Sequence, residues 1–266
     1  MVILSVILIT AIGASFFAPH DPLAHNISKK LLPPFWEEGG TSTHLLGTDH
    51  MGRDVLSRLI YGARIALLVA SIAIGVACVI GVWLGMVSGY YGGWVDTLIM
   101  RVVDIQMSMP ALLFAVALAG ALKPGLTNVI IIIVVWNWAG FTRIVRGEVL
   151  SLKERDFVAL AKVAGCSSGK IVLSHILPNV MNSIIVLATL DVGRVIIFEA
   201  SLSFLGLGVQ SPTPAWGSML AEGRNYVVSA WWLVTFPGLA IMLTCLATNL
   251  LGDWLRDAFD PKLREV

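Results

Sequence analysis

Long stretches without a charged side chain alternate with shorter polar segments along the whole chain. Residues 65–95, for example, contain no Asp, Glu, Lys or Arg over 31 positions, whereas a helix needs about 20 apolar residues to cross a bilayer. The pattern predicts an all-α integral membrane protein with six transmembrane helices, at residues 2–18, 65–95, 105–122, 126–142, 176–199 and 226–252. Pro110 and Pro237 lie inside two of these stretches, where proline favours a kink.

The first stretch, residues 2–18, has a signal peptide as its alternative interpretation. It carries no positive charge at its start, and no A-x-A cleavage site follows it. A membrane span is therefore the expected structure. We assign residues 1–19 to this first helix, residues 20–64 to an extracytoplasmic segment and residues 65–266 to a five-helix core with a short cytoplasmic tail.

Residues 20–64 are polar and balanced in charge, with five Lys/Arg and five Asp/Glu. Prolines and glycines predict a loop in the first half. The second half is amphipathic, because its apolar side chains recur at helical spacing, at Leu56, Leu59, Ile60 and Ala63. We expect a helix lying on the membrane surface there. Asp54 and Arg58 are spaced to pair across one helical turn.

The second long polar segment, residues 143–179, carries six Lys/Arg against three acids. Its interior predicts two short helices joined at Gly165, because Val158, Ala161, Val163 and Ala164 form a small apolar face before a glycine-rich turn. The excess of cations places this segment in the cytoplasm. Six spans then put both termini on that same side.

Composition supports the membrane class, since 57% of the 266 residues are hydrophobic and 13% are charged. A net charge of +1 argues against nucleic acid as a partner. Cys78, Cys166 and Cys245 show neither paired nor metal-type spacing, so we expect three free thiols.

The chain has no recognisable nucleotide site. Its nearest approach to a phosphate-binding loop, residues 165–171, has three residues between the glycines instead of four, and Ile171 stands where a Mg²⁺-binding Ser or Thr belongs. No nucleophile adjoins a base either. We therefore expect a non-catalytic chain without a bound cofactor, and any ATPase that drives it is a separate protein.

Two charges lie well inside the fifth predicted span, Asp191 and Arg194. A charge at membrane depth costs roughly 2.5–3.5 kcal/mol on insertion scales unless it is paired or faces water. The two residues either line a translocation path or form an internal ion pair, and the sequence leaves both alternatives open.

Several histidines and acids gather in the 20–64 segment and raise the question of a metal, namely His20, Asp21, His25, His44, Asp49 and His50. Their spacing matches no closed metal site, so ordinary loop histidines are the expected explanation and no metal ligand is predicted. Asp49 is expected to cap the helix that follows it.

The 143–179 segment also resembles the cytoplasmic coupling loop of bacterial ABC importer permeases. That motif sets an EAA triplet before a glycine, with an isoleucine near a Leu-Pro pair downstream, and the chain matches it at Ala161, Gly165, Ile176, Leu177 and Pro178. Ala159 and Leu160 depart from the triplet. The resemblance implies that ATPase contacts come from Asp156, Phe157, Ala159, Leu160, Ala161, Lys162, Gly165, Cys166 and Ser167, with a loop-end motif at His175, Leu177 and Pro178.

Other strings resemble the second permease of the dipeptide, oligopeptide and nickel importer group: GTD and GRD at 47–54, SFLGLG at 203–208, PTPAWG at 212–217 and DPKL at 260–263. The resemblance implies a type I ABC importer fold in a bacterial inner membrane. It also implies a heterodimer with a second permease, two ATPases that bind ATP and Mg, and a periplasmic or surface substrate-binding protein.

Substrate is less strongly indicated. The string at 31–40, LLPPFWEEGG, is most similar to dipeptide permeases, whereas LTNVII at 126–131 and VLATLDVG at 186–193 are more similar to the nickel branch. Peptides are the expected substrate and nickel the alternative. A stand-alone ion-driven carrier is the alternative from another class, but the sequence shows no inverted repeat of broken helices to support it.

Overall fold

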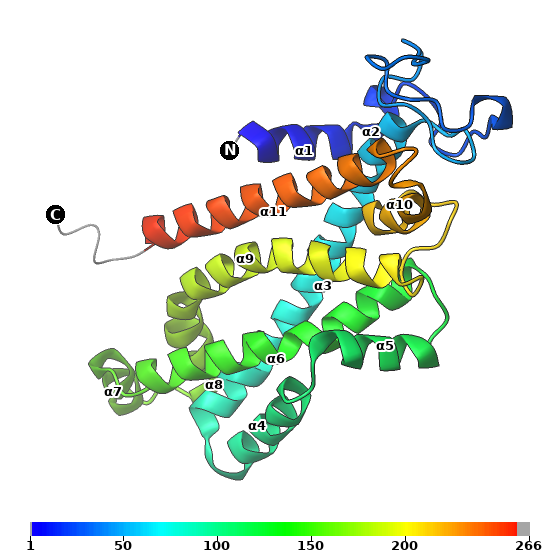
Figure 1. Cartoon of the computed structure of the whole chain (residues 1–266). Coiled ribbons are helices and arrows are strands. Elements are labelled where there is room, and N and C mark those ends of the chain that lie inside the picture. The colour runs from blue at the N-terminus through cyan, green and yellow to red at the C-terminus, as the bar shows by residue number, and fades with distance from the viewer. Residues whose placement is uncertain (1, 260–266) are drawn as a thin grey trace. The chain divides into compact units, whose positions relative to one another are not determined.

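The computed structural model describes residues 2–259 of the chain (Figure 1). Regular structure in this part is helical, apart from an isolated bridge between Thr48 and Asp54. The DPKL string at 260–263 lies outside the described residues. In chain order the elements are α1 (Val2–Ile12), α2 (Ala14–Phe17), η1 (Ile27–Lys29), α3 (Val55–Tyr91), α4 (Gly93–Met107), α5 (Ala111–Ala121), α6 (Leu126–Leu152), α7 (Asp156–Val163), α8 (Ser168–Ile171), η2 (Val172–Ile176), α9 (Leu177–Phe204), α10 (Trp216–Gly223), η3 (Arg224–Tyr226) and α11 (Trp232–Phe259).

Four helical stretches in the described residues are long and apolar enough to cross a membrane: α3, α6, the run from α8 through α9, and α11. The pair α4 and α5 is a fifth candidate, bent by 93° at the break between them. Pro110 lies in that break and disfavours helical backbone at the residue before it, so the expected kink is a full interruption. α1 has 11 residues, too few to span by itself, and the predicted count of six spans is not confirmed.

α3 corrects the expectation of a separate surface helix before the second span. It runs without interruption from Val55 to Tyr91 over 37 residues, which corresponds to a length of about 55 Å. Residues 55–64 are therefore the first turns of the long helix. The hydrocarbon layer is about 30 Å thick, so α3 must tilt strongly or extend beyond it.

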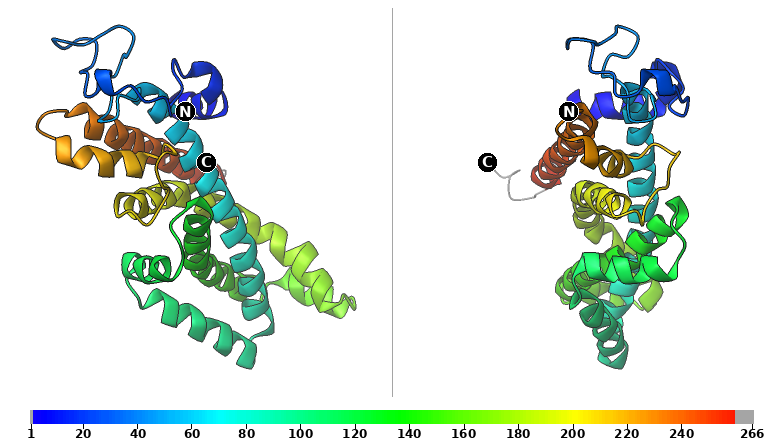
Figure 2. Two further views of the ribbon diagram at one scale, coloured as in Figure 1. Left: turned by 90° about the vertical axis from the view of Figure 1, so that its right-hand side faces the viewer. Right: turned by 45° about the vertical axis from the view of Figure 1, so that its right-hand side comes forward.

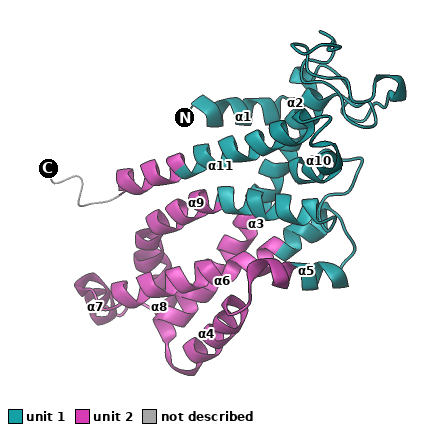
Figure 3. Cartoon of the chain, viewed as in Figure 1, with its two compact units in different colours: residues 1–72, 116–132, 192–249 teal, residues 73–115, 133–191, 250–266 magenta. Residues whose placement is uncertain are grey.

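The chain divides into two compact units, each assembled from three stretches of sequence (Figure 3). Unit 1 comprises residues 1–72, 116–132 and 192–249, and unit 2 comprises residues 73–115, 133–191 and 250–266. The units are described separately below.

Within unit 2, α3 and α6 approach closely along a row of glycines. Gly81, Gly85 and Gly89 recur every four residues, so they lie on one face of α3. A Cβ atom at Gly81 would come within 2.4 Å of Phe141 Cβ, and one at Gly89 within 2.8 Å of Val149 Cβ. The absence of side chains at these positions lets the two backbones pack together, as small residues do in membrane helix pairs.

The apolar core of unit 2 connects these spans to the polar segment that follows α6. It contains residues of α3, α6, α7, α8, η2 and the start of α9, namely Val82, Met86, Val145, Val149, Val158, Ala161, Ile171, Val172, Ile176, Val180 and Ile184. Because one cluster includes all these elements, α7 is fixed to the membrane helices of its own unit.

Unit 1 contains the chain between α2 and α3, which is irregular apart from the short helix η1 (Figures 1 and 2). Two tryptophans tie this region and the first turns of α3 to later helices. Trp216 Nε1 donates to the Leu59 carbonyl at 3.0 Å, and Trp232 Nε1 donates to the Thr48 carbonyl at 3.2 Å. Gly62 makes room for the Trp216 ring, since a Cβ there would lie 2.6 Å from its Cδ1 atom.

Candidate functional site

The centre of the 143–179 segment is the turn that ends α7. Gly165 has φ of +77°, a conformation that L side chains rarely adopt. Its N–H donates to the Lys162 carbonyl at 3.0 Å, and the Cys166 N–H donates to the Ala161 carbonyl at 3.0 Å. These two bonds form a Schellman motif, in which glycine is the favoured residue. The predicted glycine hinge between two helical pieces is confirmed.

The second helical piece is not an independent short helix. α8 continues through a π-turn at η2 into α9, so residues 168–204 form one helical run. Pro178 cannot donate to a carbonyl four residues earlier, and its ring would crowd that carbonyl. The backbone widens just before it, where the Leu177 N–H donates to the Val172 carbonyl five residues back. Such π-turns are common at functional sites.

α7 has two apolar faces with different environments. Val158 and Ala161 are buried in the core of unit 2. Leu160 is 69% exposed and Val163 is 87% exposed, and Phe157 completes the same outer stripe at 37%. The prediction that Val163 and Ala164 belong to the packed face is wrong, since both are exposed. A spacing of five residues after Val158 rotates Val163 away from the core. Phe157, Leu160 and Val163 are called the outer stripe of α7 below.

The other predicted contact residues divide by exposure. Ala161 is buried, and Cys166, His175 and Leu177 are partly buried. The exposed ones are Asp156, Phe157, Ala159, Leu160, Lys162, Gly165, Ser167 and Pro178. Most of the implied ATPase contacts are thus accessible on the surface of unit 2.

The first ten residues of the 143–179 segment are the end of α6, not a loop, and they hold two of its six cations against α4. Arg146 binds Asp96 through two hydrogen bonds, at 2.5 and 2.6 Å, and Arg143 pairs with Asp104. Lys153 adds a bond from Nζ to the Gly89 carbonyl at 3.1 Å. These contacts hold the start of the segment in place. The pairs with Asp96 and Asp104 also neutralise two of the six cations that give the segment its positive excess.

Asp191 and Arg194 both lie on α9, one turn apart. Asp191 is 9% exposed, whereas Arg194 is exposed. Their role in a path or in a pair stays a prediction. Glu199, two turns further along α9, is 1% exposed and accepts a hydrogen bond from Ser203 Oγ at 2.6 Å.

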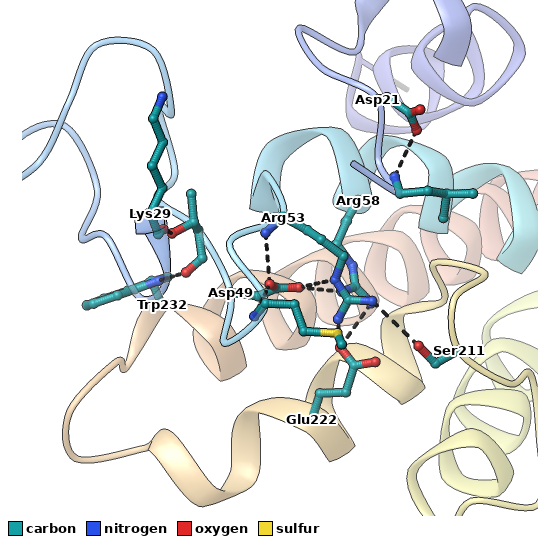
Figure 4. Close-up of polar contacts among 11 residues, drawn as sticks. Asp21, Lys29, Asp49, Arg53, Arg58, Ser211, Glu222 and Trp232 are labelled. Atoms are coloured by element: carbon teal, nitrogen blue, oxygen red, sulfur yellow. Dashed lines mark hydrogen bonds and ion pairs between the residues drawn. The ribbon is translucent and has the colours of Figure 1, made fainter. Parts of the chain in front are cut away.

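Unit 1 contains a network of four charges, of which three are buried and Glu222 is partly exposed (Figure 4). Arg53 Nε binds Asp49 Oδ2 at 2.6 Å, and Arg53 Nη2 binds Glu222 Oε2 at 2.7 Å. Arg58 also contacts Asp49, and its Nη2 lies 3.0 Å from Glu222 Oε2. Arg53 is 0% and Arg58 1% exposed, so both cations depend on these carboxylates. We call Asp49, Arg53, Arg58 and Glu222 the charge network.

The network overturns two sequence predictions and adds one residue. Arg58 pairs with Asp49 and Glu222 instead of Asp54, and Asp54, not Asp49, caps α3, since its Oδ2 accepts from the Ser57 N–H at 2.8 Å. Glu222 was missed because it lies 169 residues from Arg53. Burial acts to raise the pKa of Asp49, but Arg58, Arg53 and backbone N–H donors outweigh it and lower that pKa.

Helices able to span a membrane, together with an accessible helix–turn–helix braced against them, are typical of a multi-pass membrane permease. The chain belongs to the family described as binding-protein-dependent transport system inner membrane component, which matches residues 81–265. The resemblance to ABC importer permeases is thereby confirmed.

Individual relatives are similar over nearly the whole chain. The di/tripeptide transport system permease protein DppC of Pseudomonas aeruginosa is 44% identical over 98% of this chain and 86% of its own length. The dipeptide transport system permease protein DppC of Escherichia coli K12 is 45% identical over 100% and 88%, respectively. Among solved structures, a chain of the inward-facing MetNI methionine ABC transporter aligns with a TM-score of 0.64 at 16% identity, over 77% of this chain and 98% of that one. This last likeness shows the fold.

Proposed function

We propose that this chain forms half of the translocation pore of an ATP-driven importer for dipeptides and short oligopeptides. The observation that carries the proposal is the outer stripe of α7, an exposed apolar surface on a helix whose opposite face is locked into a core. Exposed apolar patches on a braced element are typical of protein interaction sites. The partner at this surface is a separate ATPase.

Peptides are the proposed substrate because two relatives above 40% identity are described as permeases for dipeptides or di/tripeptides. Their similarity extends over at least 98% of this chain. Asp191 and Arg194 are proposed to contribute to the path, where opposite charges suit the two termini of a zwitterionic peptide.

The assembly proposed around this chain has a second, homologous permease, two ATPases and an external substrate-binding protein. The chain spans the bacterial inner membrane with the 143–179 segment and both termini in the cytoplasm. ATP and Mg are bound by the ATPases, and this chain contributes no catalytic residue.

Coupling follows from the rigidity of the segment. When the ATPases close on ATP, they displace α7 through its outer stripe. The buried face of α7 and the continuous run from α8 into α9 pass that displacement to the start of α9 without an intervening flexible loop. Arg146 and Asp96 hold the neighbouring end of α6 against α4, so the segment moves as a lever and does not unfold.

The test replaces Leu160 with Glu, which puts a charge at the centre of the outer stripe. The matched control is Val228→Glu, because Val228 is 101% exposed and lies outside the segment. We expect Leu160→Glu to reach the membrane but to lose at least tenfold in ATPase co-purification and in uptake of a labelled dipeptide, while Val228→Glu keeps both.

Equal retention of the ATPase by the two variants would overturn the docking assignment. Uptake of Ni²⁺ instead of dipeptide by the wild-type complex would overturn the substrate assignment and leave the docking assignment standing.

A further inference from the structure

Three potential metal ligands from distant parts of unit 1 converge beside the start of α3. His20 follows α2, His44 lies in the irregular segment, and Asp54 caps α3. One ligand atom of each lies within 4.8 Å of the other two. We propose that His20, His44 and Asp54 bind a divalent transition-metal ion of the Zn²⁺ type. The proposal does not depend on which substrate the importer carries.

The distances suit a shared ion. His44 Nδ1 lies 3.0 Å and His20 Nδ1 3.7 Å from Asp54 Oδ1. Ligands about 2.0–2.1 Å from a tetrahedral ion are about 3.3–3.4 Å from one another, and the two observed separations fall on either side of that value. Two imidazoles and one carboxylate also form a ligand set that zinc favours when a fourth position is open.

Asp54 is oriented so that one oxygen is available. Its Oδ2 accepts hydrogen bonds from Ser57 N–H and Ser57 Oγ, both at 2.8 Å, which leaves Oδ1 toward the histidines. The same serine hydroxyl accepts the His20 backbone N–H at 3.0 Å and so fixes the chain at His20. Contacts of this kind orient the ligands in metal sites.

His20 has an unused ligand atom. Its Nδ1 is buried and has no hydrogen-bond partner within the described residues. The ring is stacked on that of His44, with centroids 4.6 Å apart and 29° between planes. Joint ligation therefore requires the His20 ring to turn toward Asp54 Oδ1, and the 37% exposure of its side chain leaves room for that rotation.

The three residues line a cavity of about 230 Å³ together with other side chains that include Asp21, His25, Asn26 and Lys29. It has space for the water molecules that would complete the coordination. His44 and Asp54 themselves are 7% and 2% exposed, so the protein ligands are held at the inner wall of this cavity.

A second group with ligating chemistry in the described residues, Asp49, His50 and Glu222, makes an instructive contrast. Its two carboxylates already neutralise Arg53 and Arg58, so a further cation there would meet two buried positive charges. Within the described chain Asp54 has no Lys or Arg at ion-pair distance, and its nearest basic groups are the two histidines. The site with an unneutralised carboxylate is the one that suits a metal ion.

The experiment uses the purified transporter complex, treated with a chelator and then dialysed against Zn²⁺. We expect wild type to retain one more zinc per copy of this chain than His20→Gln and His44→Gln, by elemental analysis. The matched control is His25→Gln, which alters the cavity wall but leaves the three ligands intact, and it should retain the wild-type amount.

Co²⁺ loading provides a second readout that is independent of protein stability. Wild type and His25→Gln should gain the visible absorption of a four-coordinate Co²⁺ site, and the two ligand variants should lack it. Equal zinc and equal spectra in wild type, His20→Gln and His44→Gln would overturn the proposal. The same loss in His25→Gln as in the ligand variants would also overturn it.

Discussion

The charge network of unit 1 and the outer stripe of unit 2 place polar and apolar groups in opposite ways. In the network, Arg53 and Arg58 are fully buried and form ion pairs with carboxylates of the same chain. On α7, Leu160 and Val163 are largely exposed and have no covering element in the described residues. Buried charges that are paired within the chain need no further partner, whereas exposed apolar side chains on a rigid helix require a partner from outside.

Breaking the network should have the largest effect. Arg53→Met leaves Asp49 and Glu222 without one of their cations in a buried site, and removal of one member of a buried ion pair costs about 3–5 kcal/mol. Thermal unfolding in detergent should show this loss. Arg143→Met is the control, because the Arg143–Asp104 pair is 45% and 58% exposed and should contribute less than about 1 kcal/mol. Similar losses of stability in Arg53→Met and Arg143→Met would contradict the view that the buried network stabilises the fold much more than the exposed pair does.

Acid should weaken the same network. The pKa of Asp49 is lowered in the folded state, so its carboxylate stabilises the fold at every pH above the ordinary aspartate value of about 3.9. That contribution disappears as pH falls through the lowered folded pKa. We expect the free energy of unfolding of wild type to fall steeply below about pH 4. Asp49→Asn should be less stable at pH 7, and its free energy of unfolding should change less as the pH is lowered further. Parallel pH profiles for the two proteins would contradict this assignment.

A smaller effect is expected at the hinge of unit 2. Gly165→Ala places a Cβ at φ of +77°, which costs roughly 1–2 kcal/mol, although no atom lies within 4 Å of that Cβ. The turn between α7 and α8 should relax and weaken ATPase retention several-fold in co-purification. Gly169→Ala is matched, since it has equal space and no positive φ. Loss of ATPase with Gly169→Ala but not with Gly165→Ala would point to surface contact instead of backbone geometry.

Local sequence was sufficient for the glycine turn of the 143–179 segment. Gly165, the apolar positions Val158 and Ala161, and the Leu177–Pro178 pair lie within some twenty residues of one another. The hinge they predict is formed by backbone hydrogen bonds between residues close in sequence, so it does not depend on distant parts of the chain. The exposure of Val163 and Ala164, the extension of α6 to Leu152 and the continuation of α8 into α9 were not predicted. Local spacing does not show which side of a short helix faces the core or how far a helix continues.

By itself, the sequence determined the membrane class, the run of apolar helices and the glycine turn, because hydrophobic length and backbone preference act over short distances. Only the tertiary structure decided which charges meet. Arg53 finds Glu222 across 169 residues, and His20 and His44 find Asp54, because packing of distant segments sets the partners of buried polar groups. The continuity of α3 was also a tertiary outcome, since the same pattern allows a separate surface helix.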